Sequence, residues 1–332
     1  MRPTNIARYL AFAIENNFPV LVKGKPGIGK SDIVSQAATD ANADLIISHP
    51  VVSDPTDYKG LPFPTQNGTA EFLPFGELNQ LIHAEKKTVF FLDDLGQALP
   101  SVQAACMQLL LARQINGHRI SDLVTILAAT NRREDRAGVS GLLEPVKSRF
   151  ASIVELEVDT EDWVKWAIAN DMPTELIAFI RFRPQLLDNF EPSREIQNSP
   201  SPRTVAYVGK QQMAGLPEIF EFEAFKGAAG KGFAIEYKAF LKMFRELPSM
   251  DEIIFNPSSA LVPGEPGAIY AISTALAQKM TDQNINPICQ YLERLPFEYS
   301  VACMKDALAR NRAIAQTKTF IKWSSDNSQD LL

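Results

Sequence analysis

A glycine-rich turn near the start of the chain limits its possible folds more than any other feature. Residues 24–31 read Gly-Lys-Pro-Gly-Ile-Gly-Lys-Ser, which matches the pattern G-x-x-x-x-G-K-[ST]. The apolar run at 18–22 precedes this turn, and an amphipathic stretch follows it. A strand before such a turn and a helix after it let successive backbone N–H groups surround a phosphate. We therefore predict a phosphate-binding loop at residues 24–31.

Each residue type in this loop has a chemical reason. Gly24, Gly27 and Gly29 permit backbone angles that a Cβ atom would forbid. A helix that starts near Lys30 adds partial positive charge. Lys30 is expected to reach the β- and γ-phosphates of a nucleotide, and Ser31 to ligate Mg²⁺. The predicted nucleotide-binding residues are Gly24, Lys25, Pro26, Gly27, Ile28, Gly29, Lys30 and Ser31.

Two carboxylates follow a second apolar run. Residues 88–92 read Thr-Val-Phe-Phe-Leu and lead directly into Asp93 and Asp94. A buried strand of this kind delivers acidic side chains beside the phosphate loop at its C-terminal end. We predict that Asp93 holds Mg²⁺, directly or through water, and that Asp94 orients or deprotonates the attacking water. Two acids after an apolar run are a weak signal alone and a stronger one after a phosphate loop.

An amide side chain ends a third apolar run. Residues 124–128 are predicted to form a buried strand, and Asn131 stands just beyond it. Open α/β sheets bind ligands at the C-terminal ends of their strands. Asn131 is therefore expected to hold the lytic water or to contact the γ-phosphate, and an ordinary strand-end turn is the alternative.

Apolar runs and helical periodicity alternate up to about residue 158. This alternation predicts an α/β fold, a parallel five-stranded sheet with helices on both faces. The predicted strands are 18–22, 44–48, 88–92, 124–128 and 153–156. Residues 53–77 interrupt the pattern with many prolines and glycines, and Asn67-Gly68 favours a hairpin there. Asn116-Gly117 favours a second hairpin.

The second half of the chain is predicted to be helical, because no strand-like alternation follows residue 160. We expect a nucleotide-binding domain at 1–158, a helical lid at 159–215 and a helical C-terminal extension at 216–332. One long helix or two are expected within 218–247, interrupted by Gly227, Gly230 and Gly232.

Composition narrows the class of protein. Hydrophobic residues make up 45% and charged residues 22% of the chain, which is typical of soluble globular proteins. The three cysteines and three histidines are scattered, so no disulfide framework or zinc site is expected, and a cytoplasmic location is expected instead. No apolar run reaches membrane-spanning length. The net charge of −6 argues against a dedicated nucleic-acid binder.

The order of these features resembles an AAA+ ATPase of the MoxR or dynein-related (AAA_5) type, in the helix-2-insert clade of P-loop NTPases. The resemblance spans about residues 15–215. The loop at 24–31 corresponds to Walker A, and Phe90 to Asp94 corresponds to Walker B. The excursion at 53–77 falls where the clade carries its helix-2 insert, and the Asn116-Gly117 hairpin where it carries the pre-sensor-1 hairpin.

Three further positions match the family's functional residues. Asn131 matches sensor 1, Arg149 in Lys-Ser-Arg-Phe matches the arginine finger, and Arg203 in Ser-Pro-Arg matches sensor 2. The resemblance implies that Arg149 acts on the γ-phosphate of a neighbouring subunit, and that Arg203 couples the nucleotide to a lid. A surface salt bridge is the alternative for either arginine. With Asp94, these three residues form the predicted catalytic set.

The family also implies cofactors and partners. ATP and Mg²⁺ are expected, together with a ring-shaped oligomer that is usually a hexamer. Relatives of the MoxR type often act with von Willebrand factor A domain proteins, so a protein substrate of that kind is implied. A nucleic-acid motor of the same clade is a further alternative, which the acidic charge does not favour.

One departure from the family concerns hydrolysis. Walker B usually ends in Asp-Glu, whereas this chain has Asp93-Asp94. The carboxylate of an aspartate reaches about 1.5 Å less far than that of a glutamate. This difference favours a second hypothesis, a scaffold that hydrolyses ATP poorly and assembles when ATP binds. Residues after about 215 match no motif.

Overall fold

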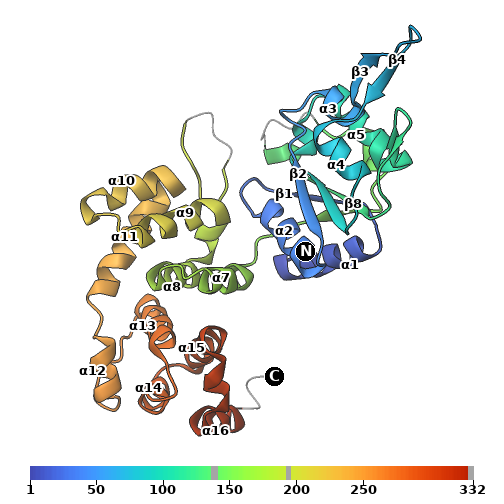
Figure 1. Cartoon of the computed structure of the whole chain (residues 1–332). Helices are drawn as coiled ribbons and strands as arrows, with labels where there is room; N and C mark the ends of the chain where they lie inside the picture. Colours follow the sequence, from blue (N-terminus) through green and yellow to red (C-terminus); the bar gives the residue numbers. More distant parts are fainter. Residues whose placement is uncertain (136–140, 192–195, 328–332) are drawn as a thin grey trace. The chain divides into compact units, whose positions relative to one another are not determined.

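The computed structural model describes residues 1–135, 141–191 and 196–327. The chain forms two compact units, Met1–Asp159 and Thr160–Leu332. The first unit is an α/β sandwich and the second is helical, which confirms the predicted fold class (Figure 1). The predicted division of the helical part near residue 215 stays a prediction.

A five-stranded parallel sheet forms the centre of the first unit, in the order β2-β5-β8-β1-β9. The strands are β1 (Val20–Gly24), β2 (Asp44–Ser48), β5 (Thr88–Leu92), β8 (Val124–Asn131) and β9 (Ser152–Glu155). Because all the pairings are parallel, the C-terminal ends of the strands share one edge of the sheet. The register of β1 and β8 pairs Gly24 with Asn131, so the phosphate loop starts beside that amide.

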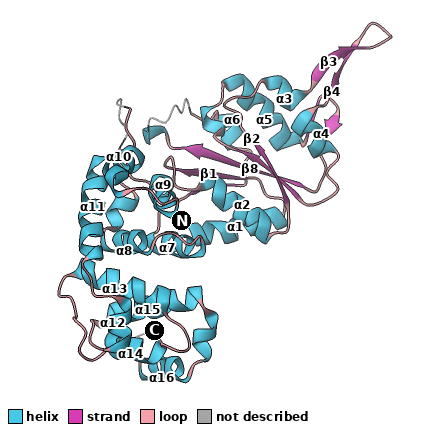
Figure 2. Cartoon of the chain, turned by 60° about the vertical axis from the view of Figure 1, so that its left-hand side comes forward, coloured by secondary structure: helices cyan, strands magenta, loops and turns pink. Residues whose placement is uncertain are grey.

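Helices cover both faces of the sheet (Figure 2). The helices are α1 (Pro3–Glu15), α2 (Lys30–Asp40), α3 (Pro55–Lys59), α4 (Gly76–Ile82), α5 (Pro100–Ala112) and α6 (Glu144–Lys147). Side chains of β5 alternate between the two faces, so Phe91 packs with α1 and α2 while Phe90 packs with α3 to α6. All five residues of β5 are buried, and this explains the continuous apolar run in the sequence.

The segment 53–77 leaves the core as the sequence predicted. It contains α3 and an antiparallel hairpin of β3 (Leu61–Pro64) and β4 (Ala70–Leu73), which projects from the unit (Figure 1). Tyr58 fixes the base of this segment, because its ring is buried and its hydroxyl lies 2.9 Å from the Ser48 hydroxyl. Burial raises the pKa of Tyr58 to about 12.

A second small hairpin contacts the first. It consists of β6 (Gln114–Ile115) and β7 (His118–Arg119), around the predicted Asn116-Gly117 turn. The Asn116 amide donates a hydrogen bond of 2.8 Å to the Lys59 carbonyl. The ring of His118 lies 2.6 Å from the Phe72 carbonyl. These contacts tie both ends of the projecting hairpin to the body of the unit.

The second unit has no strand in its described residues. Its helices are α7 (Thr160–Ala169), α8 (Thr174–Phe182), α9 (Pro202–Met213), α10 (Glu218–Ala229), α11 (Lys231–Arg245), α12 (Met250–Phe255), α13 (Pro266–Lys279), α14 (Ile285–Leu292), α15 (Phe297–Arg310) and α16 (Lys318–Asp326). Short 3₁₀ turns in the chain are η1 (Leu95–Gln97), η2 (Arg133–Asp135), η3 (Pro184–Leu187) and η4 (Arg312–Gln316). No described helix is both long and apolar enough to cross a membrane.

Of the three glycines expected to interrupt 218–247, only one does so. Gly230 separates α10 from α11 with a φ of 88°, and a Cβ there would lie 2.9 Å from the Asn198 carbonyl oxygen. Gly227 and Gly232 lie inside the two helices. The break therefore depends on Gly230 alone, because it is the glycine with a left-handed backbone.

A buried ion pair joins α8 to α15. The guanidinium of Arg181 donates two hydrogen bonds to the Asp306 carboxylate, and the side chains are only 7% and 5% exposed. Burial lowers the pKa of Arg181, but the hydrogen bond and the charge of Asp306 outweigh it, so the pKa is raised. Without Asp306, the buried Arg181 charge would keep only the more distant and exposed carboxylate of Glu161, at 3.8 Å.

This pair generates a stability prediction for the second unit. Asp306→Asn should lower the free energy of unfolding by about 3–5 kcal/mol, since it removes the only buried charge that pairs with Arg181 in the described residues and leaves the exposed Glu161. Urea unfolding followed by tryptophan fluorescence measures this unit, because Trp163, Trp166 and Trp323 all lie in it.

Glu236→Gln, which breaks the exposed pair with Arg183, is the matched control and should cost less than about 1 kcal/mol. Equal losses in the two variants would contradict the role assigned to the buried pair.

Candidate active site

The phosphate loop lies between β1 and α2. Gly27 and Gly29 have φ values of 75° and 90°, in the left-handed region that the sequence predicted for them. Gly24 does not have a positive φ, so the predicted reason for that glycine is wrong. A Cβ at Gly24 would lie 2.5 Å from Ile28 Cδ1 and 3.1 Å from the Leu156 carbonyl oxygen. Close packing of the loop against the buried Ile28 and Leu156 therefore explains this glycine.

Lys30 begins α2, and its side chain folds back over the loop. Its Nζ atom donates hydrogen bonds to the carbonyl oxygens of Gly24 (3.1 Å) and Lys25 (2.9 Å). A third and shorter bond, 2.6 Å, reaches Oδ1 of Asn131. Lys30 is only 7% exposed. The ammonium group is thus held between the loop and the end of β8.

Ser31 and Asp93 meet across the same edge of the sheet. The Ser31 hydroxyl donates a hydrogen bond of 2.7 Å to Oδ2 of Asp93. The backbone N–H of Asp93 donates to the Ser48 carbonyl oxygen at 2.9 Å, which fixes the residue at the end of β5. A hydroxyl and a carboxylate so close together are hard oxygen ligands that suit Mg²⁺. The donor set therefore fits the predicted cation.

Asp94 lies beside Asn131 and beside a residue, Gln97, that the sequence patterns did not indicate. Oδ1 of Asp94 accepts hydrogen bonds from the Asn131 amide (3.3 Å) and from the Gln97 amide (2.8 Å). The backbone of Asp94 is left-handed, with a φ of 56° and a ψ of 32°. Gln97 has no motif of its own, and only its spacing of three residues after an acidic residue in a turn could have indicated the contact.

Arg132 is a second residue whose contacts no sequence motif indicates. Its guanidinium donates two hydrogen bonds to the Asp135 carboxylate, at 2.9 and 2.7 Å. The hydrogen bond to Asp135 raises the pKa of Arg132. Arg132 immediately follows Asn131, so this pair fixes the chain where β8 ends and keeps the amide beside Lys30.

The structure does not bring Arg149 into this cluster. Arg149 lies between α6 and β9, and the nearby Ser152 pairs with Val20 at the start of β1. It is therefore at the opposite edge of the sheet from the phosphate loop. Arg203 belongs to the second unit, where it is exposed in the first turn of α9. Its predicted contact with a nucleotide stays a prediction.

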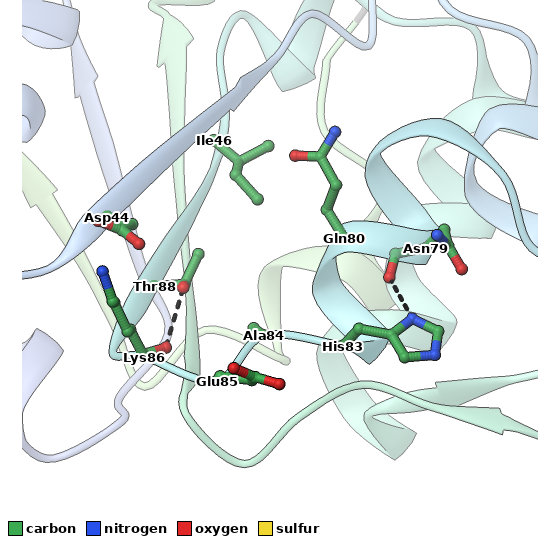
Figure 3. Close-up of a pocket in the computed structure, with 9 residues that line it drawn as sticks. All are labelled: Asp44, Ile46, Asn79, Gln80, His83, Ala84, Glu85, Lys86 and Thr88. Atoms are coloured by element: carbon green, nitrogen blue, oxygen red, sulfur yellow. Dashed lines mark hydrogen bonds between the residues drawn. The ribbon is translucent and has the colours of Figure 1, made fainter.

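The first unit also has a surface cavity of about 550 Å³ (Figure 3). It is lined by Asp44 and Thr88 at the starts of β2 and β5, and by Asn79, Gln80 and His83 on and after α4. Because the strands are parallel, their starts lie at the edge opposite the phosphate loop. None of the predicted nucleotide-binding residues lines this cavity. The candidate active site is therefore the cluster at the C-terminal edge.

Comparisons with known proteins concern the part of the chain that contains this cluster. Residues 20–158 match the model of the family described as "ATPase family associated with various cellular activities (AAA)". Midasin of Giardia intestinalis is 28% identical over 192 residues. That alignment covers 54% of this chain but only 4% of the length of midasin.

Solved structures similar to the chain include two bacterial proteins. The Holliday junction branch migration motor RuvB of Thermotoga maritima superposes with a TM-score of 0.36 and 16% identity, over 85% of this chain and 71% of that one. A putative ATPase from Cytophaga hutchinsonii gives a TM-score of 0.36 and 15% identity, over 82% and 74% of the two chains.

The family match carries more weight than these similarities. It begins at the first residue of β1 and ends just after β9, so it spans the whole sheet and every residue of the cluster. Over residues 20–158, the first unit is therefore similar to AAA ATPase domains.

Proposed function

We propose that this protein binds ATP with Mg²⁺, hydrolyses it, and uses the reaction in a MoxR-like ring to remodel a protein partner. The observation that carries the proposal is that two hydrogen-bonded pairs of side chains lie at the same edge of the sheet. Lys30 contacts Asn131 at 2.6 Å, and Ser31 contacts Asp93 at 2.7 Å. A cation, an amide, a hydroxyl and a carboxylate thus surround the mouth of a glycine-rich loop.

Each of these groups has a role in phosphoryl transfer. Lys30 would exchange its bonds to loop carbonyls for bonds to the β- and γ-phosphates, and the loop N–H groups would hold the remaining phosphate oxygens. Ser31 and Asp93 would hold Mg²⁺, which neutralises charge on the phosphates when it is bound. Asn131 would then be left to contact the γ-phosphate or the attacking water.

Asp94 would act on the attacking water. Its carboxylate accepts a proton from the water while the water oxygen forms a bond to the γ-phosphorus. The bond from that phosphorus to the bridging oxygen breaks, and the electron pair leaves with ADP. The products are ADP and inorganic phosphate. The hydrogen bond from Asn131 to Asp94 supports this role, because it holds the carboxylate at the sheet edge from which the phosphate loop begins.

The position of Arg149 supports an oligomer. Arg149 lies at the sheet edge where β1 starts, and the phosphate loop lies where β1 ends. The five residues of β1 put roughly 15 Å between these two edges. An arginine side chain extends only about 7 Å, so Arg149 cannot reach the site of its own subunit. Among the described residues Arg149 forms no ion pair; its one side-chain hydrogen bond is to the Ser148 hydroxyl. This guanidinium is therefore suited to a phosphate in a neighbouring subunit.

The hairpin of β3 and β4 supports a protein partner. Its apolar side chains are unusually exposed, with Phe63 at 59%, Leu73 at 48% and Phe72 at 38%. Exposed apolar surface on a projecting element is typical of a protein interaction site. Resemblance to MoxR-type proteins favours a von Willebrand factor A domain protein as that partner, and a hexamer as the ring.

A second candidate function is a nucleotide-gated scaffold with slow hydrolysis. The observation that favours it is the short Asp94 side chain, one of whose oxygens is already occupied by two amide donors. In that case ATP binding itself would drive assembly, and turnover would be negligible.

Asp94→Asn separates these two functions. For the ATPase, this change should lower kcat by about 10²–10⁴-fold with little effect on ATP affinity, since it removes the base but keeps the shape. Steady-state phosphate release with Mg²⁺ measures the effect. Asp44→Asn, an exposed aspartate at the opposite sheet edge, is the matched control and should turn over like the unaltered protein. An unaltered protein that assembles with ATP but releases no phosphate would favour the scaffold.

A mixing experiment tests the ring. Arg149→Ala and Asp94→Asn should each be inactive alone, because the first lacks the arginine and the second lacks the base. Mixed in equal amounts they should recover activity, since about a quarter of the interfaces would join an intact base to an intact arginine. Light scattering checks that both variants assemble. Assembled mixtures that stay inactive would contradict a shared site.

A further inference from the structure

Gln97 makes the strongest contact with Asp94 outside the predicted catalytic set. It ends η1, three residues after the aspartate, and its Nε2 atom donates to Oδ1 of Asp94 at 2.8 Å. The bond from Asn131 to the same oxygen is longer, at 3.3 Å. Oδ2 of Asp94 accepts no hydrogen bond within the described part of the chain. The contacts therefore hold one carboxylate oxygen and leave the other available.

The backbone places Gln97 for this contact. The left-handed conformation of Asp94 turns the chain sharply into η1, and the N–H of Gln97 donates to the Asp94 carbonyl oxygen at 2.9 Å. Leu95 between them is fully buried, which fixes the turn in the core. The side-chain contact is thus built on a rigid segment.

The carbonyl oxygen of the Gln97 side-chain amide is unusual. This Oε1 atom is buried, and no donor among the described residues reaches it. A buried acceptor without a partner is unfavourable, and a methionine or leucine of similar size would avoid that cost. Packing therefore does not explain a glutamine here. The contact that does explain it is the hydrogen bond to Asp94.

We propose that Gln97 is a positioning residue that compensates for the short Asp94. Two donors on Oδ1 restrict rotation of the carboxylate, so Oδ2 keeps one direction. A fixed direction toward the attacking water would compensate for the shorter side chain. A glutamate at position 94 would reach further and would depend less on such support. This inference rests on the proposed ATP hydrolysis and adds a residue that the family's motifs do not include.

Gln97→Met tests the proposal, because it keeps the length of the side chain and removes the amide. We expect kcat for ATP to fall by about 10- to 100-fold, as for a misplaced catalytic group. KM and the affinity for ADP should change by less than about twofold, because Gln97 does not contact the loop. A kcat that is unchanged, or that rises because the amide restrains Asp94 from acting, would overturn the proposal.

A double-mutant cycle separates positioning from a structural role. In an Asp94→Glu background, Gln97→Met should lower kcat by less than about threefold, because the longer acid no longer needs the support. Gln97→Asn, whose amide is too short to reach Oδ1, should behave like Gln97→Met and serves as a second variant. Equal losses in both backgrounds would show that Gln97 supports the fold rather than the base.

The same assays distinguish a failure of the proposed ATPase activity from a failure of the role of Gln97. If the unaltered protein releases no phosphate, both the proposed ATPase activity and the role of Gln97 are contradicted. If the unaltered protein is active and Gln97→Met is equally active, only the role of Gln97 is contradicted. Thermal melting of each variant, with and without ADP, shows that lost activity is not lost folding.

Discussion

The hydrogen bond between Lys30 and Asn131 is the contact on which the rest of the site depends. Its two residues lie 101 positions apart in sequence and meet at 2.6 Å. They meet because β1 and β8 are neighbours in the parallel sheet, with Gly24 level with Asn131. From Asn131, hydrogen bonds lead to Asp94 and then to Gln97. Next to Lys30 in the sequence, Ser31 contacts Asp93. A change in strand register would separate all of them at once.

The sheet also explains which predicted residues stand apart. Parallel strands give the first unit two chemically different edges, and the chain places its polar side chains accordingly. The edge where strands end holds the cation, the carboxylates and the amides. The edge where strands start holds Arg149 and the surface cavity beside Asp44. This division is the basis for the proposal of a site shared between subunits, in which one edge of a subunit would face the other edge of its neighbour.

Much of this arrangement could be predicted from the sequence, for physical reasons. The glycine-rich turn and the apolar runs that end in acids or an amide are local patterns, and each maps onto one strand and its end. Gln97 and Arg132 could not be found in this way, because their roles come from contacts formed only after folding. Gly24 was found for the wrong reason, since its close approach to Ile28 depends on how the loop packs. Gly230 differs from Gly227 and Gly232 in its positive φ and in the Asn198 carbonyl oxygen that a Cβ would meet, and both differences arise only on folding.

The central claim is that the cluster around Lys30 is a nucleotide site, and direct binding tests it best. Titration calorimetry with ATP and Mg²⁺ should give one site in the unaltered protein. In Lys30→Ala the affinity should fall by about 100-fold or more, since a charge-assisted contact to phosphate worth roughly 3 kcal/mol is lost. Lys86→Ala, an exposed lysine at the opposite edge, should bind as the unaltered protein does. Equal affinity in all three proteins, or no binding in any, would contradict the account.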